Sequence, residues 1–272
     1  MKTPDIYTYH DHLLFLRDWL AYRKASQPGF SLRTLAKECG ISAAYLPLVL
    51  AGKRTLTFKA LQKIESHLGL SRQERSYLEA LVTLGTTDSQ AVRLDALEKM
   101  KRFGSYKKAN PKELEAYQYL THWYYVAIRE MATLPGFEPT PEWIQPRLKF
   151  NVPVAEISAA IEFLEQNGYF SEPNKSIECV GGVFKVALTQ FHHEVLELAA
   201  QSITDTPSEK RSIQGHTVAL DSEQIDEARQ ILNEALQKIQ DLSKSKRTPD
   251  SVYHVELALF PLSLPASKRS SS

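Results

Sequence analysis

Residues 32–50 read LRTLAKECGISAAYLPLVL, and this stretch decides the fold of the N-terminal third of the chain. Two short helices that cross closely need an apolar seam, a small residue at the crossing and a turn residue that tolerates positive φ. The stretch therefore predicts helices over 32–38 and 43–50 with a tight turn between them. The positions that meet these needs are Leu35, Ala36, Gly40, Ile41, Leu46 and Val49.

Each helix predicted in residues 1–86 has a residue at its start or end that favours that boundary. Ser and Thr hydroxyls accept hydrogen bonds from first-turn N–H groups, and a Glu three residues later completes a capping box. Gly and Pro mark helix ends. We therefore predict a compact five-helix domain with the helices 9–25 (then Pro28-Gly29), 32–38 (Ser31), 43–50 (Ser42), 58–68 (Thr57, Gly69) and 72–84 (Ser71 with Glu74).

Positive charge is concentrated in this domain. The 272-residue chain carries 33 Lys and Arg against 32 Asp and Glu, a net charge of +1. Residues 1–86 carry 12 against 7, and the remainder carries 21 against 25. The excess lies within residues 31–63, where Glu38 is the only acid and the bases are Arg33, Lys37, Lys53, Arg54, Lys59 and Lys63. Such local basicity is typical of a nucleic-acid interface, and a solvated helix surface is the alternative.

Together with the following AGKRTLTFKALQKIESHLGLS, this stretch resembles the lambda-repressor/Cro-like helix-turn-helix domain over residues 10–84. The resemblance implies double-stranded DNA as the partner, with the second helix entering the major groove. It places Ser42, Ala43, Ala44, Tyr45, Pro47 and Leu48 at or near base edges. It places Arg33, Thr34, Lys53, Arg54 and Lys59 near phosphates.

The base-facing positions depart from that pattern. Direct readout needs side chains that form hydrogen bonds with base edges, and Ala43, Ala44 and Leu48 have none to offer. Pro47 inside a helix would cost about 3 kcal/mol, so the helix either starts later than Ser42 indicates or bends. The polar readers that remain are Ser42, Tyr45 and the Lys53-Arg54 loop. The domain could instead bind phosphates without sequence preference, or serve protein–protein contacts.

The rest of the chain predicts a mainly α fold with a smaller α+β part. Residues 87–110 read as a polar connector with one helix, and 111–190 as a helical, winged-helix-like domain. Its aromatic-rich first helix is expected in the core, and a hairpin follows the helix 153–166, with a turn at Pro173-Asn174. Residues 191–264 predict a small α/β unit in the order helix 191–203, strand 211–219, helix 222–242 and strand 252–260, before a disordered tail at 265–272.

Several stretches in fixed order resemble one family of predicted bacterial regulators, in which this domain precedes a long region of unknown function. The resemblance covers residues 6–264 and implies a transcription regulator without an established ligand or reaction. Residues 141–190 carry 4 basic and 6 acidic side chains, which favours dimerisation or effector binding there over DNA binding. Among the stretches are YQYLTHWYYVAIREMATLPGF, PEWIQPRL, FHHEVLELAA, IQGHTVALD and VYHVELALFPLS.

Other chemistry has little support in the sequence. The two cysteines, Cys39 and Cys179, are too few for a disulfide framework and fit a reducing cytoplasm. No apolar run reaches the length of a membrane span, so no membrane contact is expected. Phosphate-binding loops and nucleophile motifs are absent, which argues against an enzyme and a cofactor. A metal site is the weaker alternative for His192, His193, Glu194, Glu197, His216 and His254.

The sequence thus predicts a cytoplasmic, homodimeric, DNA-binding transcription regulator whose C-terminal part dimerises and senses a protein or small-molecule effector. Two alternatives stay open. The first is an interaction module whose helix-turn-helix no longer reads DNA, and the second is a ligand-sensing adaptor.

Overall fold

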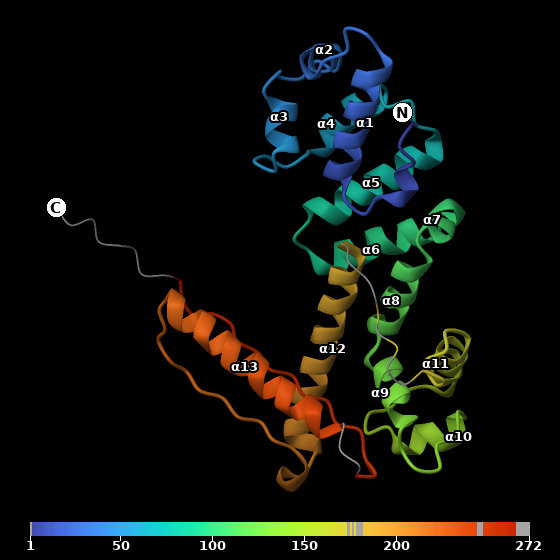
Figure 1. The fold of residues 1–272 in the computed structure, drawn as a ribbon, viewed down its shortest axis with the longest axis vertical. Coiled ribbons are helices and arrows are strands. Elements are labelled where there is room, and N and C mark those ends of the chain that lie inside the picture. Colours follow the sequence, from blue (N-terminus) through green and yellow to red (C-terminus); the bar gives the residue numbers. More distant parts are fainter. Residues whose placement is uncertain (1, 173–174, 176, 178–181, 244–246, 265–272) are drawn as a thin grey trace, which may run out of the picture. The chain divides into compact units, whose positions relative to one another are not determined.

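The computed structural model describes residues 2–172, 175, 177, 182–243 and 247–264, and it is mainly helical (Figure 1). The chain forms two compact units: Met1–His122 with Asn174–Phe191, and Trp123–Pro173 with His192–Ser272. In the described ranges no residue belongs to a β-strand. None of the helices described is both long and apolar enough to cross a membrane.

Three helices of the first unit begin directly after the predicted caps Ser31, Thr57 and Ser71. The Ser31 hydroxyl accepts a hydrogen bond from the Thr34 N–H at 3.1 Å, and Ser71 and Glu74 form a capping box. The domain starts with the short 3-10 helix η1 (Ile6–Thr8). Its α-helices are α1 (His12–Ser26), α2 (Leu32–Glu38), α3 (Tyr45–Leu50), α4 (Phe58–Glu65) and α5 (Arg72–Thr86).

The predicted apolar seam forms the core between α2 and α3. Leu35, Ala36, Leu46 and Val49 are at most 3% exposed, and Ile41 is half-buried. Cys39 at the end of α2 is buried as well, and burial raises the pKa of its thiol. The helix-turn-helix predicted from the sequence is confirmed.

Residues 87–110 are integral to the first unit, which corrects the prediction of a polar connector with one helix. They form α6 (Gln90–Lys101) and α7 (Gly104–Ala109), ahead of α8 (Pro111–Thr121). Tyr106 is fully buried, and its ring centroid lies 5.6 Å from that of Tyr77 in α5. Tyrosine packing across α5 and α7 is a tertiary contact that local composition does not reveal.

The second unit is built around the aromatic-rich segment. Its helices are α9 (Trp123–Met131), α10 (Pro141–Ile144), α11 (Val154–Gln166) and α13 (Ser222–Ser243), with 3-10 turns at Gln145–Arg147 and Ser208–Lys210. The Tyr125 ring packs edge-on against Phe163 with centroids 5.4 Å apart, and Tyr169 is 1% exposed. Tyr124 and Tyr125 are buried, as expected, whereas Trp123 is half-buried.

The predicted hairpin is wrong in both strands, as far as the structure describes them. Residues from Gly182 onward form the 24-residue helix α12 (Gly182–Asp205), and residues 169–171 form a turn. Val183, Val186, Ala187 and Phe191 are buried, and their spacing is that of a helix face. The predicted turn at Pro173-Asn174, the break at Gly181 and Cys179 lie outside the described residues.

The predicted α/β unit is also wrong, although its helix 222–242 is present as α13. Residues 211–219 and 252–260 form no strand. Strand formation needs a hydrogen-bonded neighbour, and among the described residues neither segment makes a backbone–backbone bond beyond Arg211. The predicted tail at 265–272 lies outside the described residues.

Candidate nucleic-acid interface

Helix α3 begins at Tyr45, two residues later than predicted. Ala44 is its N-cap residue and provides no side-chain hydrogen bond, so Ser42 does not cap this helix. Pro47 is the third residue of α3, where a backbone N–H would have no acceptor within the helix. The cost of an interior proline therefore does not arise, and the later start of the helix is confirmed.

The turn between α2 and α3 depends on Gly40, whose φ is +58°. The Ile41 N–H donates to the Ala36 carbonyl at 2.9 Å, and the Gly40 N–H donates to the Lys37 carbonyl at 3.1 Å. This pair of bonds is a Schellman motif, which favours glycine at the left-handed position. The Lys63 ammonium donates to the Gly40 carbonyl at 3.0 Å, so this base supports the turn.

A second Schellman motif ends α3 at Gly52, whose φ is +71°. The Lys53 N–H donates to the Leu48 carbonyl at 2.9 Å, and the chain then leaves the helix. Lys53 and Arg54 are both exposed at this end of α3. The Arg54 guanidinium carbon lies 5.1 Å from the centroid of the Tyr45 ring, which limits the range of positions open to this charge.

Tyr45 is 8% exposed and is used within the domain. Its hydroxyl donates to the Thr55 carbonyl at 3.1 Å and accepts from the Thr57 N–H at 3.0 Å. Thr57 in turn caps α4. Tyr45 therefore connects α3 to α4 and is not on the exposed surface of α3, where the sequence placed it.

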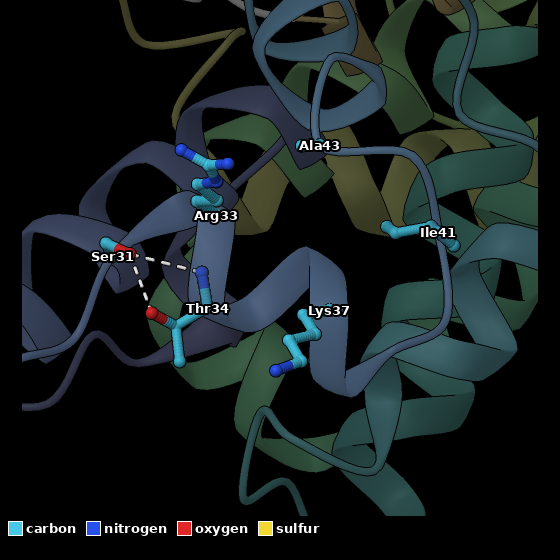
Figure 2. Close-up of a pocket in the computed structure, with 6 residues that line it drawn as sticks. All are labelled: Ser31, Arg33, Thr34, Lys37, Ile41 and Ala43. Carbon is cyan, nitrogen blue, oxygen red and sulfur yellow. Dashed lines mark hydrogen bonds between the residues drawn. The ribbon is translucent and has the colours of Figure 1, made fainter.

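A shallow groove lies between α2 and the turn that leads to α3 (Figure 2). Arg33 and Lys37 are one helical turn apart on α2 and are exposed, and Ala43 lines the groove from the turn that precedes α3. The Ser31 and Thr34 hydroxyl oxygens are 2.8 Å apart in a hydrogen bond at its edge. Lys37 belongs to this basic surface, although the resemblance did not single it out.

The exposed bases keep their charges available. Among the described residues no acid forms an ion pair with Arg33, Lys37, Lys53, Arg54 or Lys59. Glu38, the only acid in residues 31–63, faces His67, with 3.6 Å between its carboxylate and Nδ1. The Arg17 guanidinium donates to the Leu50 carbonyl at the end of α3.

The exposed surface of α3 and the residues before it is largely apolar. Leu48 is 39% exposed, and Ser42 is the only exposed residue here with a polar side chain between Ile41 and Leu50. The remaining exposed residues of this surface are Ala43, Ala44 and Pro47. The structure therefore brings together an apolar helix surface and basic groups at both ends of the helix-turn-helix.

Two of the four histidines considered as metal ligands, His192 and His254, contact the same carboxylate. His192 Nδ1 lies 2.9 Å from one Glu256 oxygen, and His254 Nε2 lies 3.1 Å from the other. Glu194 accepts a hydrogen bond from the Trp123 N–H at 2.9 Å. In the part of the chain that the structure describes, no group of three or more His, Cys, Asp and Glu side chains could hold a metal ion.

Comparison with known families agrees with this architecture. A family model described as helix-turn-helix matches residues 20–75, which contain α2, α3 and α4. A second model, described as a domain of unknown function (DUF4423), matches residues 105–262. No curated protein and no solved structure shows a significant match. A helix-turn-helix domain of this kind is typical of DNA-binding regulators.

Proposed function

The chain belongs to the DUF4423 family and has a helix-turn-helix domain ahead of the family region, and we propose that it is a DNA-binding transcription regulator. One observation supports this most strongly: exposed bases without acidic partners lie at both ends of the helix-turn-helix. A surface that served only to keep the protein soluble would be expected to carry basic and acidic side chains side by side.

The phosphate contacts are assigned to two groups of side chains. Arg33 and Lys37 on α2, with the Thr34 hydroxyl beside them, contact one strand of the duplex. Lys53, Arg54 and Lys59, in and after the turn that ends α3, contact the backbone at the other end of the helix. Each neutralised phosphate releases condensed counterions, so most of the affinity depends on salt.

The exposed surface of α3 gives this regulator little direct readout of its own. Ala43, Ala44 and Leu48 can pack against thymine methyl groups, and the Ser42 hydroxyl can form a hydrogen bond with a base edge. Pairing of two chains in a homodimer raises the affinity of two weak half-site contacts through effective concentration. We assign dimerisation, and the sensing of a protein or small-molecule effector, to the C-terminal part.

A salt-dependent titration tests the proposal. Full-length protein is titrated into labelled double-stranded DNA fragments at several salt concentrations, beside the variant Lys53→Ala/Arg54→Ala. Each lost phosphate contact lowers the steepness of log Kd against log salt by about 0.9, so the double variant should lose about 1.8. The matched control is Lys107→Ala/Lys108→Ala, which removes the same charge from exposed positions on α7 and should behave as wild type.

A protein that fails to bind DNA even at low salt would contradict the proposal and favour the interaction module. If the Lys53/Arg54 and Lys107/Lys108 variants lost the same amount of salt dependence, DNA binding would depend on the overall charge of the protein and not on this interface. Binding that keeps its salt dependence in the Lys53/Arg54 variant would place the phosphate contacts elsewhere.

A further inference from the structure

Leu48 in α3 faces away from the core that its neighbours form. It is 39% exposed, whereas Leu46 and Val49 are 3% and 0% exposed. The α3 residues that pack against the rest of the domain therefore leave Leu48 on the outer side of this short helix. A single exposed leucine is common on protein surfaces, so its meaning depends on the residues and charges beside it.

The exposed residues that accompany Leu48 are small and apolar. The Leu48 N–H donates to the Ala44 carbonyl at 3.3 Å, which places these two residues one helical turn apart on the same face. Alanine and proline project little beyond the backbone, so a partner can approach closely while Leu48 projects furthest toward it. We call the four exposed residues Ala43, Ala44, Pro47 and Leu48 the α3 apolar surface.

Side chains that form bidentate hydrogen bonds with base edges are missing from this stretch of sequence. Those bonds come from Arg, Lys, Asn and Gln, and none of these types occurs in residues 41–52. The Tyr45 hydroxyl is bonded within the domain, and the Arg54 guanidinium carbon lies 5.1 Å from the centroid of the Tyr45 ring. The surface therefore offers apolar contact where a regulator of this kind usually offers polar groups.

The charges on both sides of the α3 apolar surface identify the kind of partner. Arg33 and Lys37 on α2 precede it in the chain (Figure 2), and Lys53 and Arg54 follow it. Such a surface complements a partner with apolar groups between two rows of negative charge. The major groove of duplex DNA has a row of phosphates on each side of its base edges. The apolar group on those edges is the 5-methyl group of thymine.

We propose that the α3 apolar surface binds the 5-methyl groups of thymine in the major groove, and that Leu48 is the side chain that selects them. This inference rests on the proposed function and names the base that the interface prefers. Base selection then comes from apolar contact rather than from the Ser42 hydroxyl. Because only one strand of an A·T pair carries the methyl group, the contact also distinguishes A·T from T·A.

The size of the effect follows from the burial of one methyl group. Removing such a group from water is worth about 0.8 kcal/mol, which corresponds to about a 4-fold change in affinity. Uracil has the hydrogen-bonding groups of thymine and lacks only the methyl. Cytosine and 5-methylcytosine differ in the same way, so each pair of bases isolates the methyl contact.

The experiment first identifies sequences that the protein prefers. Full-length protein is mixed with a pool of random duplex DNA at low salt, and the bound molecules are sequenced. Thymine should be enriched at one or more positions. The bound duplexes are then resynthesised with uracil, cytosine or 5-methylcytosine at an enriched position. Uracil should weaken binding about 4-fold relative to thymine, and 5-methylcytosine should bind about 4-fold more tightly than cytosine.

Three variants test which side chain makes the contact. Leu48→Ala should reduce the thymine-to-uracil affinity ratio to about 2 or less, and it should keep its circular dichroism because Leu48 is exposed. Leu196→Ala is the matched control, since Leu196 is a leucine 45% exposed on α12, and it should keep the wild-type ratio. Ser42→Ala should also keep that ratio, because a hydroxyl gains nothing from a methyl group.

The outcomes separate this inference from the proposed function. A bound pool without thymine enrichment, equal binding of thymine and uracil duplexes, or an unchanged ratio in Leu48→Ala would overturn the inference and leave salt-dependent DNA binding standing. A ratio that is lost in Ser42→Ala and kept in Leu48→Ala would assign base selection to the hydroxyl and overturn it as well. A wild-type protein that binds no DNA at low salt would overturn the proposed function and the inference together.

Discussion

Helices α4 and α13 use apolar residues at helical spacing to opposite effect. The eight-residue helix α4 buries Ala60, Leu61 and Ile64 in the core of the first unit, whereas the 22-residue helix α13 buries none of its residues. Short helices are unstable alone, so α4 exists because of the core that it joins. The comparison teaches that the N-terminal domain completes its own core, while α13 leaves apolar residues such as Ile231 and Leu242 exposed.

The largest expected effect on stability comes from a large-to-small substitution in the core of the N-terminal domain. Leu61→Ala should lower the free energy of unfolding of this domain by about 2–5 kcal/mol, because a cavity replaces a fully buried side chain. Urea unfolding followed by Trp19 fluorescence measures it in a background with Trp123 and Trp143 changed to Phe. Ile231→Ala in α13 is the control and should leave this transition unchanged. An equal shift in both would refute the contrast between the helices.

Removing the hydroxyl of Tyr45 should have the next largest effect. Tyr45→Phe leaves the Thr57 N–H and the Thr55 carbonyl without a bond that they make in the folded domain. Each lost hydrogen bond lowers the free energy of unfolding by about 0.5–1.5 kcal/mol, and the same unfolding transition reports the change. Tyr253→Phe, at an exposed position after α13, should have no effect on that transition. If Tyr45→Phe left the unfolding transition unchanged, the Tyr45 hydroxyl would not contribute to the packing of α3 against α4.

The N-terminal domain should lose stability in mild acid. His12 is 5% exposed, and burial lowers its pKa below the usual 6.5, so the folded domain holds a neutral imidazole. The unfolded chain then binds the proton more readily, and stability present above pH 6.5 declines as the pH falls below that value. His12→Gln should flatten the dependence of the unfolding free energy on pH between 6.5 and 5. An unchanged slope would assign the effect to other groups, such as His10, whose pKa burial also lowers.

The smallest expected effect compares two helix caps. Ser71→Ala removes the capping box of α5 and should cost the N-terminal domain about 1 kcal/mol. Asp221 caps α13 by accepting hydrogen bonds from the Glu223 and Gln224 N–H groups at 2.9 Å. Asp221→Ala should lower the helix content measured by circular dichroism and leave the N-terminal unfolding transition in place. A shift of that transition by Asp221→Ala would show that the two regions unfold together.

Helix caps and apolar spacing predict the helix-turn-helix because both depend only on residues that are close together in the sequence. Ser31, Thr57 and the Ser71–Glu74 pair each act on the first turn of the helix that follows. Ser42 fails as a predictor because a hydroxyl at that position does not reveal that the helix begins only at Tyr45. The bases of the candidate interface are likewise visible in the sequence, since charge clusters need no tertiary information.

The C-terminal part shows where local reasoning ends. Residues 182–189 contain both β-branched residues and helical spacing, and the two signals predict different structures. The segment forms helix α12, because helical spacing places Val183, Val186 and Ala187 on one face, where all three side chains are buried. Segments 211–219 and 252–260 have strand composition, but a strand also needs a hydrogen-bonded neighbour.

By itself the sequence determined the helix-turn-helix and its basic surface, because each follows from residues close together in the chain. Only the tertiary structure decided that Tyr45 is buried, that Glu38 faces His67 and that α13 has no fully buried residue. Burial and the pairing of polar groups depend on contacts between distant residues, and those contacts exist only once the helices have packed.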